Sequence, residues 1–231
     1  MSQHSLDRPV WNSLRSGWAH LAQAEGQAVR LDPDYGPFAA VADTQAASLG
    51  ALRNLIPTNG ELWLVEREPA LALLPGFTPL RQAELVQMLA SDIKGEAKPV
   101  EIVALSEADA AEMIALAHLT KPGPFAVHTN RLAEFVGVKA DGKLIAMCGE
   151  RMKLPGYSEL SGLCTHPDFQ GQGLGGALMR HVARRILARG EQVFLHAYTS
   201  HSSTVAFYQS LGFDVRAVMT LAVFDGVAGA G

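Results

Sequence analysis

The chain has 231 residues, of which 48% are hydrophobic and 18% are charged, and its formal net charge is -4. This composition is typical of a globular protein with a buried core and excludes a largely disordered chain. No run of lysine or arginine indicates nucleic-acid binding, and no stretch approaches the roughly 18 consecutive apolar residues of a membrane span. We therefore expect a cytoplasmic protein with neither nucleic-acid nor membrane partners.

The first 95 residues predict a small α/β unit without a chemical motif. Its expected elements are an amphipathic helical pattern within 11–21, a strand at 28–31, a helix at 44–56, a strand at 61–66, and an apolar segment at 80–90 that fits either a strand or a helix. The polar stretch 91–99, with Gly95 and Pro99, is the expected boundary between an N-terminal unit, 1–95, and a second domain, 96–231.

The second domain shows a clearer alternation of elements. We expect helices from 106 onward, at 174–186 and at 202–211, and strands at 100–105, 135–139, 144–151, 157–165, 193–199 and 213–224. Asp141-Gly142 is a strong two-residue hairpin signal. Hairpins and helical crossovers together predict a mixed sheet with helices on its faces. Cys148 and Cys164 lie in apolar surroundings and are expected to be buried free thiols.

A glycine-rich loop precedes the helix at 174–186. Gly171, Gly173 and Gly176 match the dinucleotide-binding pattern G-x-G-x-x-G, but four residues, 166–169, separate this loop from the strand before it. The next strand also lacks the acidic end that would hold a ribose, and no Lys-Ser/Thr follows as in a P-loop. What remains is a loop whose N–H groups, at a helix N-terminus, suit a phosphate.

Two short signatures together identify a family. Gln170-Gly-Gln-Gly-Leu-Gly175 fits the pattern Q/R-x-x-G-x-G/A, and Phe207-Tyr208 stands shortly before Leu211-Gly-Phe213. Over residues 100–225 the chain resembles the GNAT superfamily of acyl-CoA-dependent N-acyltransferases, most closely the branch with glycine N-acyltransferase-like domains. The resemblance implies an α/β (α+β) fold with a mixed, mostly antiparallel sheet and helices on both faces. Residues 1–95 can then be a degenerate half of a similar fold.

The resemblance implies acetyl-CoA, or another acyl-CoA, as cosubstrate. Its pyrophosphate would rest on the glycine loop, and its pantetheine arm would lie along the strand at 157–165, where the backbone N–H near Leu163 would stabilise the oxyanion. The implied cofactor-binding residues are Leu163, Cys164, Thr165, Gln170, Gly171, Gln172, Gly173, Leu174, Gly175, Gly176, His201 and Tyr208. The histidines do not have metal-site spacing, so no metal is expected.

The expected chemistry is attack of an amine on a thioester. A lysine-type amine has a pKa of about 10.4 and must lose a proton before it attacks. Glu159 is the first candidate for the base and Glu150 the second, although either can equally be a surface or substrate-holding carboxylate. Tyr208 matches the family's acid for the leaving thiolate. His201 stands where the family often has asparagine, and it can also take part in proton removal.

The loop 121–130 is the expected wall of the acceptor site, with the alternative that it is a plain connector. Pro122, Gly123 and Phe125, together with Glu150, are the candidate acceptor-binding residues. We expect an N-acetyltransferase that acts on the primary amine of a small molecule by direct attack in a ternary complex. A non-catalytic acyl-CoA-binding sensor and a protein or peptide N-acetyltransferase are the alternatives. The slight acidic balance fits cationic acceptors without deciding for them, and a homodimer stays open.

Overall fold

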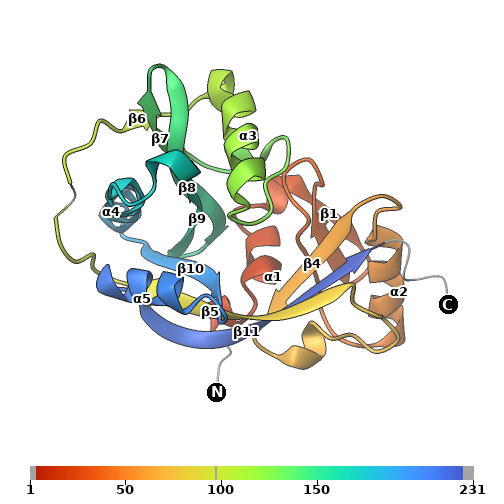
Figure 1. The fold of residues 1–231 in the computed structure, drawn as a ribbon. Helices are drawn as coiled ribbons and strands as arrows, with labels where there is room; N and C mark the ends of the chain where they lie inside the picture. Colours follow the sequence, from red (N-terminus) through yellow and green to blue (C-terminus); the bar gives the residue numbers. More distant parts are fainter. Residues whose placement is uncertain (1–3, 97, 226–231) are drawn as a thin grey trace.

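The described part of the chain, residues 4–96 and 98–225 of a computed structural model, contains two β-sheets with helices packed against them (Figure 1). The smaller, antiparallel sheet consists of β1 (Ala22–Glu25), β2 (Ala28–Leu31) and β3 (Ala39–Val41). The eight strands of the larger sheet lie in the order β4 (Glu61–Glu66), β11 (Asp214–Asp225), β5 (Arg81–Ala90), β10 (Gln192–Tyr198), β9 (Tyr157–Thr165), β8 (Lys143–Leu154), β7 (Phe135–Ala140) and β6 (Val103–Ala104). The α-helices are α1 (Pro9–Leu14), α2 (Ala46–Leu55), α3 (Ala110–Thr120), α4 (Leu174–Ala188) and α5 (Ser202–Ser210).

The larger sheet is mixed and mostly antiparallel, with helices on both faces, which confirms the predicted fold class. Its neighbouring strands are antiparallel except for β9 and β10, which run parallel. Met113 of α3 packs in one core cluster with Phe135 and Met147, whereas α4 packs in another cluster with Val136 and Cys148. Consecutive residues of a strand point to opposite faces, so α3 and α4 cover opposite sides of the sheet.

Helix α4 follows directly from its apolar pattern. Leu174, Leu178, Val182 and Ile186 are buried on one side of it, as their spacing predicts. The helix ends just before Gly190, whose φ of 79° is the left-handed conformation that glycine adopts readily at helix C-termini. The position of α4 matters for function because its first residue follows the glycine loop.

Strand β5 lies between β10 and β11 and pairs with both. Residues 85–90 of β5 align with β10, and residues 81–89 align with β11. This pairing shows that the segment at 80–90 is a strand. Strand β4 joins the same sheet through β11, so the sheet crosses the expected boundary at residues 95 and 96. The division into two units, and a degenerate GNAT-like half within 1–95, stay predictions.

Two expected elements are shorter than the sequence predicted. The helical pattern within 11–21 gives an α-helix only as far as Leu14, and the chain then turns against β8. A Cβ atom on Gly17 would lie 2.6 Å from Cβ of Lys153, so the contact depends on glycine. The strand expected at 100–105 is limited to Val103 and Ala104, which pair with β7, and the N–H group of Leu105 donates one further hydrogen bond to the carbonyl of Phe135.

Both cysteines are free and buried, as predicted. Among the described residues, no helix combines the length and apolar character that crossing a bilayer would require.

Candidate functional site

A cavity of about 310 Å³ lies where the two parallel strands separate. Strands β9 and β10 are paired from Gln192–Tyr157 to Phe194–Glu159, and the recorded pairing ends there. Beyond that point, Leu163 of β9 and His196 and Tyr198 of β10 line the cavity. The fork between the strands therefore gives access to the edge of β9 from the cavity side.

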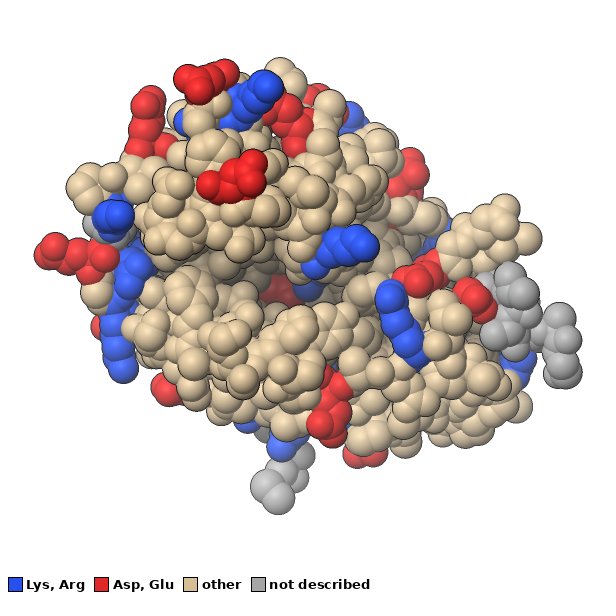
Figure 2. All heavy atoms as spheres, in the orientation of Figure 1, with Lys and Arg blue, Asp and Glu red and all other residues tan. Residues whose placement is uncertain are grey.

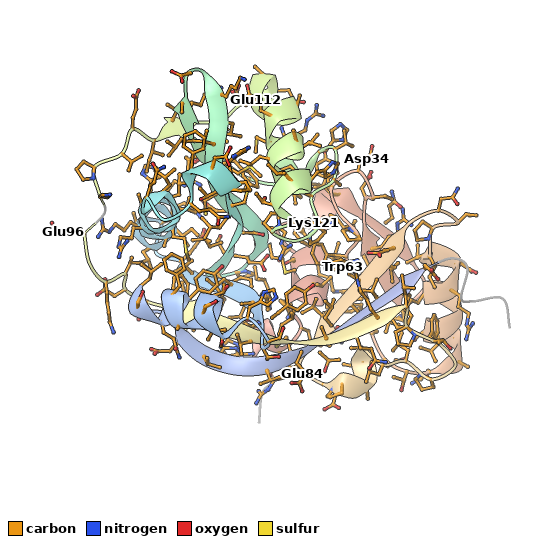
Figure 3. The ribbon with its side chains drawn as sticks, in the orientation of Figure 1. Asp34, Trp63, Glu84, Glu96, Glu112 and Lys121 are labelled. Carbon is orange, nitrogen blue, oxygen red and sulfur yellow. The ribbon has the colours of Figure 1, made fainter. Side chains whose placement is uncertain are left out.

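The walls of this cavity come from parts of the chain that are far apart in the sequence. The loop after α3 contributes Lys121 and its neighbours, helix α5 contributes Tyr208, and the N-terminal part contributes Phe38 and Trp63. Figure 3 labels Lys121 and Trp63 near the middle of the molecule. Figure 2 shows a hollow in the centre of the same face, with Lys and Arg side chains beside it and a small acidic area in its depth.

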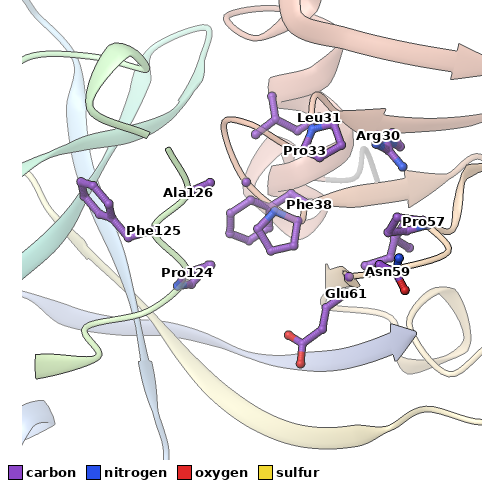
Figure 4. Close-up of a pocket in the computed structure, with 14 residues that line it drawn as sticks. Arg30, Leu31, Pro33, Phe38, Pro57, Asn59, Glu61, Pro124, Phe125 and Ala126 are labelled. Atoms are coloured by element: carbon purple, nitrogen blue, oxygen red, sulfur yellow. The ribbon is translucent and has the colours of Figure 1, made fainter. Parts of the chain in front are cut away.

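A second cavity of about 310 Å³ adjoins the first. It lies between the N-terminal part and the loop after α3, and it shares Phe38 and Pro124 with the first cavity. Figure 4 shows Phe38, Pro124 and Ala126 with Arg30 and Glu61 around it. Phe38 and Pro124 thus form part of the wall between the two cavities.

The glycine loop has an open backbone at the start of α4. Gly171 and Gly173 have φ values of 75° and 84°, and a Cβ atom on Gly171 would meet no heavy atom within 4 Å. Gly173 is the N-cap of α4, and no side chain caps that helix end. A Cβ atom on Gly175 would lie 3.8 Å from Cδ1 of Leu163, so the loop lies close to β9. Uncapped N–H groups at the positive end of a helix fit a phosphate group.

Tyr208 and His201 both line the cavity, from α5 and the residue before it. Burial raises the pKa of the Tyr208 phenol to about 12, so the hydroxyl group keeps its proton at neutral pH. The ring of His201 lies 5.3 Å from that of Tyr198, and the side chain is exposed. The protonated phenol of Tyr208 and the exposed imidazole of His201 therefore line the same cavity.

Glu159 is buried at the fork instead of lining the cavity. Its oxygens accept hydrogen bonds from Nε and Nη2 of Arg151, at 2.7 and 2.8 Å, and from Nδ1 of His196 at 2.8 Å. The backbone N–H of Met152 adds a longer contact. Burial alone would raise the pKa of Glu159, but the charge and hydrogen bonds of Arg151 outweigh it and lower that pKa to about 2. A fully bonded carboxylate of this kind is a poor proton acceptor, which argues against the first candidate base.

The proton on His196 can be assigned from its neighbours. Oε1 of Gln87 accepts from Nε of Arg216, and Nε2 of Gln87 donates to the carbonyl of Leu6. The amide nitrogen of Gln87 also lies 3.0 Å from Nε2 of His196, so that ring nitrogen must accept. His196 therefore carries its proton on Nδ1 and donates it to Glu159. The other ring nitrogen, Nε2, already accepts a hydrogen bond from Gln87 and is not free to take a proton from a substrate.

Glu150, the second candidate, does not line either cavity. Its carboxylate is buried and bonded to Arg185, Arg189 and Lys153. Arg189 lies 2.6 Å away, just after the end of α4. The surrounding cations, with hydrogen bonds from Arg189, lower the pKa of Glu150 despite its burial. Glu150 fits a structural role, and the acceptor-binding role expected from the sequence is not supported.

The other predicted residues divide into two groups. Leu163, His201, Tyr208, Pro122 and Gly123 line the first cavity. Phe125 instead lines the second cavity and a small crevice near Arg151, whereas Cys164 packs under α3, where burial raises its thiol pKa to about 11. Thr165, Gln170, Gln172, Leu174 and Gly176 lie on or beside the glycine loop. Within the described residues, no group of three or more His, Cys, Asp or Glu side chains is placed to hold a metal ion.

Several residues of the cavity were not predicted from the sequence, among them Phe38, Trp63, Arg151 and His196. None belongs to a recognised motif, and two come from the part of the chain in which no chemistry was expected. Lys121 lies in the loop 121–130 that was expected to form the acceptor wall, and it adopts a left-handed backbone conformation in the structure. That conformation could not be read from the sequence.

Comparison with known proteins gives consistent matches. A family model described as FR47-like protein matches residues 135–221. The chain is 33% identical over 129 residues to N-alpha-acetyltransferase RimI of Mycobacterium tuberculosis, covering 51% of this chain and 80% of that protein. It is also 33% identical over 75 residues to the ribosomal protein bS18-alanine N-acetyltransferase of Escherichia coli, covering 32% of this chain. The match spans 50% of the length of that second relative.

Solved structures match over nearly the whole chain. An acetyltransferase assigned to the GNAT family from Novosphingobium aromaticivorans is 45% identical, with a TM-score of 0.82, and the match covers 96% of this chain and 98% of that one. A GCN5-related N-acetyltransferase from Kribbella flavida is 19% identical, with a TM-score of 0.64, over 92% of this chain and 93% of the other. At this lower identity the likeness concerns the fold alone.

The ion pair between Glu159 and Arg151 predicts that the free energy of unfolding depends on pH. The pKa of Glu159 falls from 4.5 to about 2 on folding, so its stabilisation is complete above 4.5 and is lost as the pH falls towards 2. We expect Glu159→Gln to lower the free energy of unfolding by roughly 3–5 kcal/mol at pH 7, because Arg151 is left without its charge partner. The variant should also lose less stability than the wild type between pH 5 and pH 2.

Urea unfolding at several pH values measures both effects. Glu107→Gln is the control, because Glu107 has a similar pKa of about 2 but forms an exposed pair with Arg131. It should change stability at pH 7 far less. Equal effects of the two substitutions would contradict the assigned role of Glu159.

Proposed function

The chain belongs to the GNAT superfamily and is an N-acetyltransferase, and on that premise we propose that it acetylates the primary amine of a small molecule in a ternary complex with acetyl-CoA. The observation that carries this proposal is the cavity at the fork of β9 and β10, with Tyr208 on its wall. Its volume of about 310 Å³ lies at the lower end of the range for small-molecule sites, roughly 300–1,000 Å³.

The N-terminal part of the chain supports a small acceptor. Phe38, Trp63 and Val65 line the cavity together with residues of the loop after α3. They limit the space in which an acceptor can lie beside the thioester. A folded protein would require an open surface there.

A second candidate function is acetylation of a protein or peptide N-terminus. The names of the Escherichia coli and Mycobacterium tuberculosis relatives favour it, since the former acts on ribosomal protein bS18. An extended N-terminal segment is narrower than a folded protein and can enter a cavity of this kind. Thiol release measured with small amines and with peptides separates the two candidates. The glycine N-acyltransferase-like branch stays a prediction.

The glycine loop fits the pyrophosphate of acetyl-CoA. Gly171 exposes its backbone to open space, the N-terminus of α4 is free of a capping side chain, and Lys98 lies beside Gly173 with its ammonium group on the carbonyl of Gln172. Leu163 connects the loop to the cavity, because it lies near Gly175 and also lines the cavity. A pantetheine arm of acetyl-CoA that lies along β9 would thus extend from the glycine loop to Tyr208.

An ammonium acceptor loses one proton to solvent before it attacks and a second as the amide bond forms, and the departing sulfur gains one. We assign the last two transfers to residues of the cavity. Acetyl-CoA supplies the thioester, whose C–S bond breaks as the acceptor nitrogen forms a bond to the acetyl carbon. His201 accepts the proton that the nitrogen loses, directly or through water, since Glu159 and the basic nitrogen of His196 are already bonded. Tyr208 donates a proton to the departing sulfur, although burial raises the pKa of its phenol, and it regains a proton from solvent. The backbone N–H near Leu163 is the proposed donor to the oxyanion.

Thiol release tests the proposal directly. The full-length protein is incubated with acetyl-CoA and, separately, with small amines, peptides that begin with alanine, and no acceptor. We expect turnover with a small amine above that with the peptides. Turnover on peptides alone would support the second candidate, cofactor binding without turnover would support a sensor, and no binding of CoA would overturn all three.

Tyr208→Phe should lower kcat roughly 10–100-fold and leave the affinity for acetyl-CoA near normal. The effect is modest because a thiol of pKa about 8.5 is already a good leaving group. Tyr157→Phe removes a hydroxyl group from the far end of β9, outside the cavity lining, and is the control. Unchanged turnover in Tyr208→Phe would remove this residue from the mechanism.

Gly171→Ala should raise KM for acetyl-CoA, because the added methyl group enters the open space beside the loop backbone. Gly190→Ala is a matched control at the other end of α4: φ is 79° there and 75° at Gly171, and neither Cβ atom would meet a heavy atom within 4 Å. Both variants should lose similar stability through backbone strain. An equal rise in KM in the two variants would show that the effect is not local to the loop.

A further inference from the structure

We propose that the amine acceptor also carries a carboxylate, as an amino acid does, and that Lys121 binds this carboxylate with the help of Arg151. The inference rests on the proposed function and specifies its substrate class. The overall charge of the chain, which fits cationic acceptors without deciding for them, is too small to weigh against it.

The charges around the cavity favour an anionic group. Lys121 and Arg151 line it, and no aspartate or glutamate belongs to its lining within residues 4–96 and 98–225. The charge of Arg151 is already balanced by the buried Glu159 behind the wall, so Lys121 is the cation of the lining that lacks a described partner. Figure 2 shows Lys and Arg side chains beside the central hollow, at its rim, and a small acidic area only in its depth. An amine arrives mostly as a cation, and a cation without a compensating anion is disfavoured near like charges. A carboxylate on the same molecule removes this conflict.

Arg151 has one nitrogen available to a ligand. Its Nε and Nη2 atoms donate to Glu159, and its guanidinium stacks on Phe38 at 4.7 Å from the ring centroid. Nη1 makes no recorded hydrogen bond in the described part of the chain and lies beside Gly123, another residue of the cavity wall. The guanidinium is therefore held rigidly, with one side directed towards the loop after α3.

Lys121 is in a backbone conformation that disfavours a lysine. It caps the C-terminus of α3 with φ 50° and ψ 56°, the left-handed region in which glycine is usual. Its side chain is exposed, and its ammonium group forms no ion pair or hydrogen bond with the described residues, so it is available to a ligand in the cavity. Unfavourable backbone conformations of this kind cluster at binding sites.

Lys121 differs from Asp141 in the reason for its left-handed backbone conformation. Asp141, with φ 49°, is the other non-glycine residue of the described chain with a positive φ. It lies in the two-residue turn between β7 and β8, where the hairpin itself requires that conformation. At Lys121 a glycine would satisfy the helix end equally well. Compared with glycine, Lys121 adds a long cationic side chain to the cavity wall.

Lys121 lies apart from the glycine loop, so it is not expected to bind the pyrophosphate of acetyl-CoA. None of the residues Gly171 to Gly176 belongs to the cavity lining that contains Lys121. Trp63 lines the same cavity, and Figure 3 labels both residues in the middle of the molecule. The cation therefore lies at the acceptor end of the site, and the acceptor supplies its anion.

The test compares amino acids with the same amines lacking the carboxylate, for example phenylalanine with 2-phenylethylamine and alanine with ethylamine. In the wild type, kcat/KM should favour the amino acid of each pair. Lys121→Gly should reduce this preference roughly 10–100-fold, as expected for a lost charge-assisted hydrogen bond. The same variant should melt at a higher temperature, because glycine relieves the unfavourable backbone conformation. Lost preference together with higher stability cannot be ascribed to misfolding.

Two further variants control the comparison. Asp141→Gly makes the same backbone change outside the cavity, so it should leave the preference as in the wild type. Lys121→Glu reverses the charge and should shift the preference towards the amine without a carboxylate. A wild type that acetylates both members of each pair equally, or prefers alanyl peptides with amidated C-termini, would overturn the inference while leaving an acetyltransferase in place.

Binding provides a readout that does not depend on turnover. Phenylalanine should raise the melting temperature of the wild type in the presence of CoA more than 2-phenylethylamine does, and Lys121→Gly should abolish the difference. If no amine is acetylated but this difference is present, the proposed function fails and the carboxylate site stands. Equal shifts for both compounds in the wild type would overturn the site.

Discussion

The buried carboxylate of Glu159 holds the point at which β9 and β10 separate. Glu159 aligns with Phe194 in the last recorded pair between these strands, and its side chain bonds to Arg151 of β8 and His196 of β10. One side chain thus connects three strands at the fork. A buried ion pair of this kind contributes less to net stability than to fixing one arrangement, because desolvation offsets much of the attraction. Here the arrangement it fixes is the opening of the cavity.

The same contacts extend from the fork into the N-terminal part of the chain. His196 accepts from Gln87 of β5, and Gln87 is oriented by Arg216 and by the carbonyl of Leu6. Arg216 also bonds to Asp7, at 2.6 Å. Because β5 lies between β10 and β11, the N-terminal part supports the strand that forms one side of the fork. It also supplies Phe38 and Trp63 to the cavity wall, so its structural contribution reaches the site itself.

Local patterns made part of the site predictable. The glycine loop, α4 and Tyr208 follow from spacings within a few residues, and all lie where such patterns expect them. The roles of Glu159 and Glu150 were not predictable, because their cationic partners determine whether each carboxylate is free or bonded. Those partners lie up to 39 residues away in the sequence. The place of β5 was also unpredictable, since it pairs with strands more than 100 residues later.

A crystal structure of the protein with CoA and phenylalanine would test the arrangement most directly. The expected result has the pyrophosphate on the N–H groups of Gly171 to Gly176 and the sulfur atom within hydrogen-bonding reach of the Tyr208 hydroxyl group. The phenylalanine carboxylate should lie beside Lys121 and Nη1 of Arg151, with its amine directed towards the sulfur. CoA bound away from the fork of β9 and β10, or a carboxylate remote from Lys121, would contradict it.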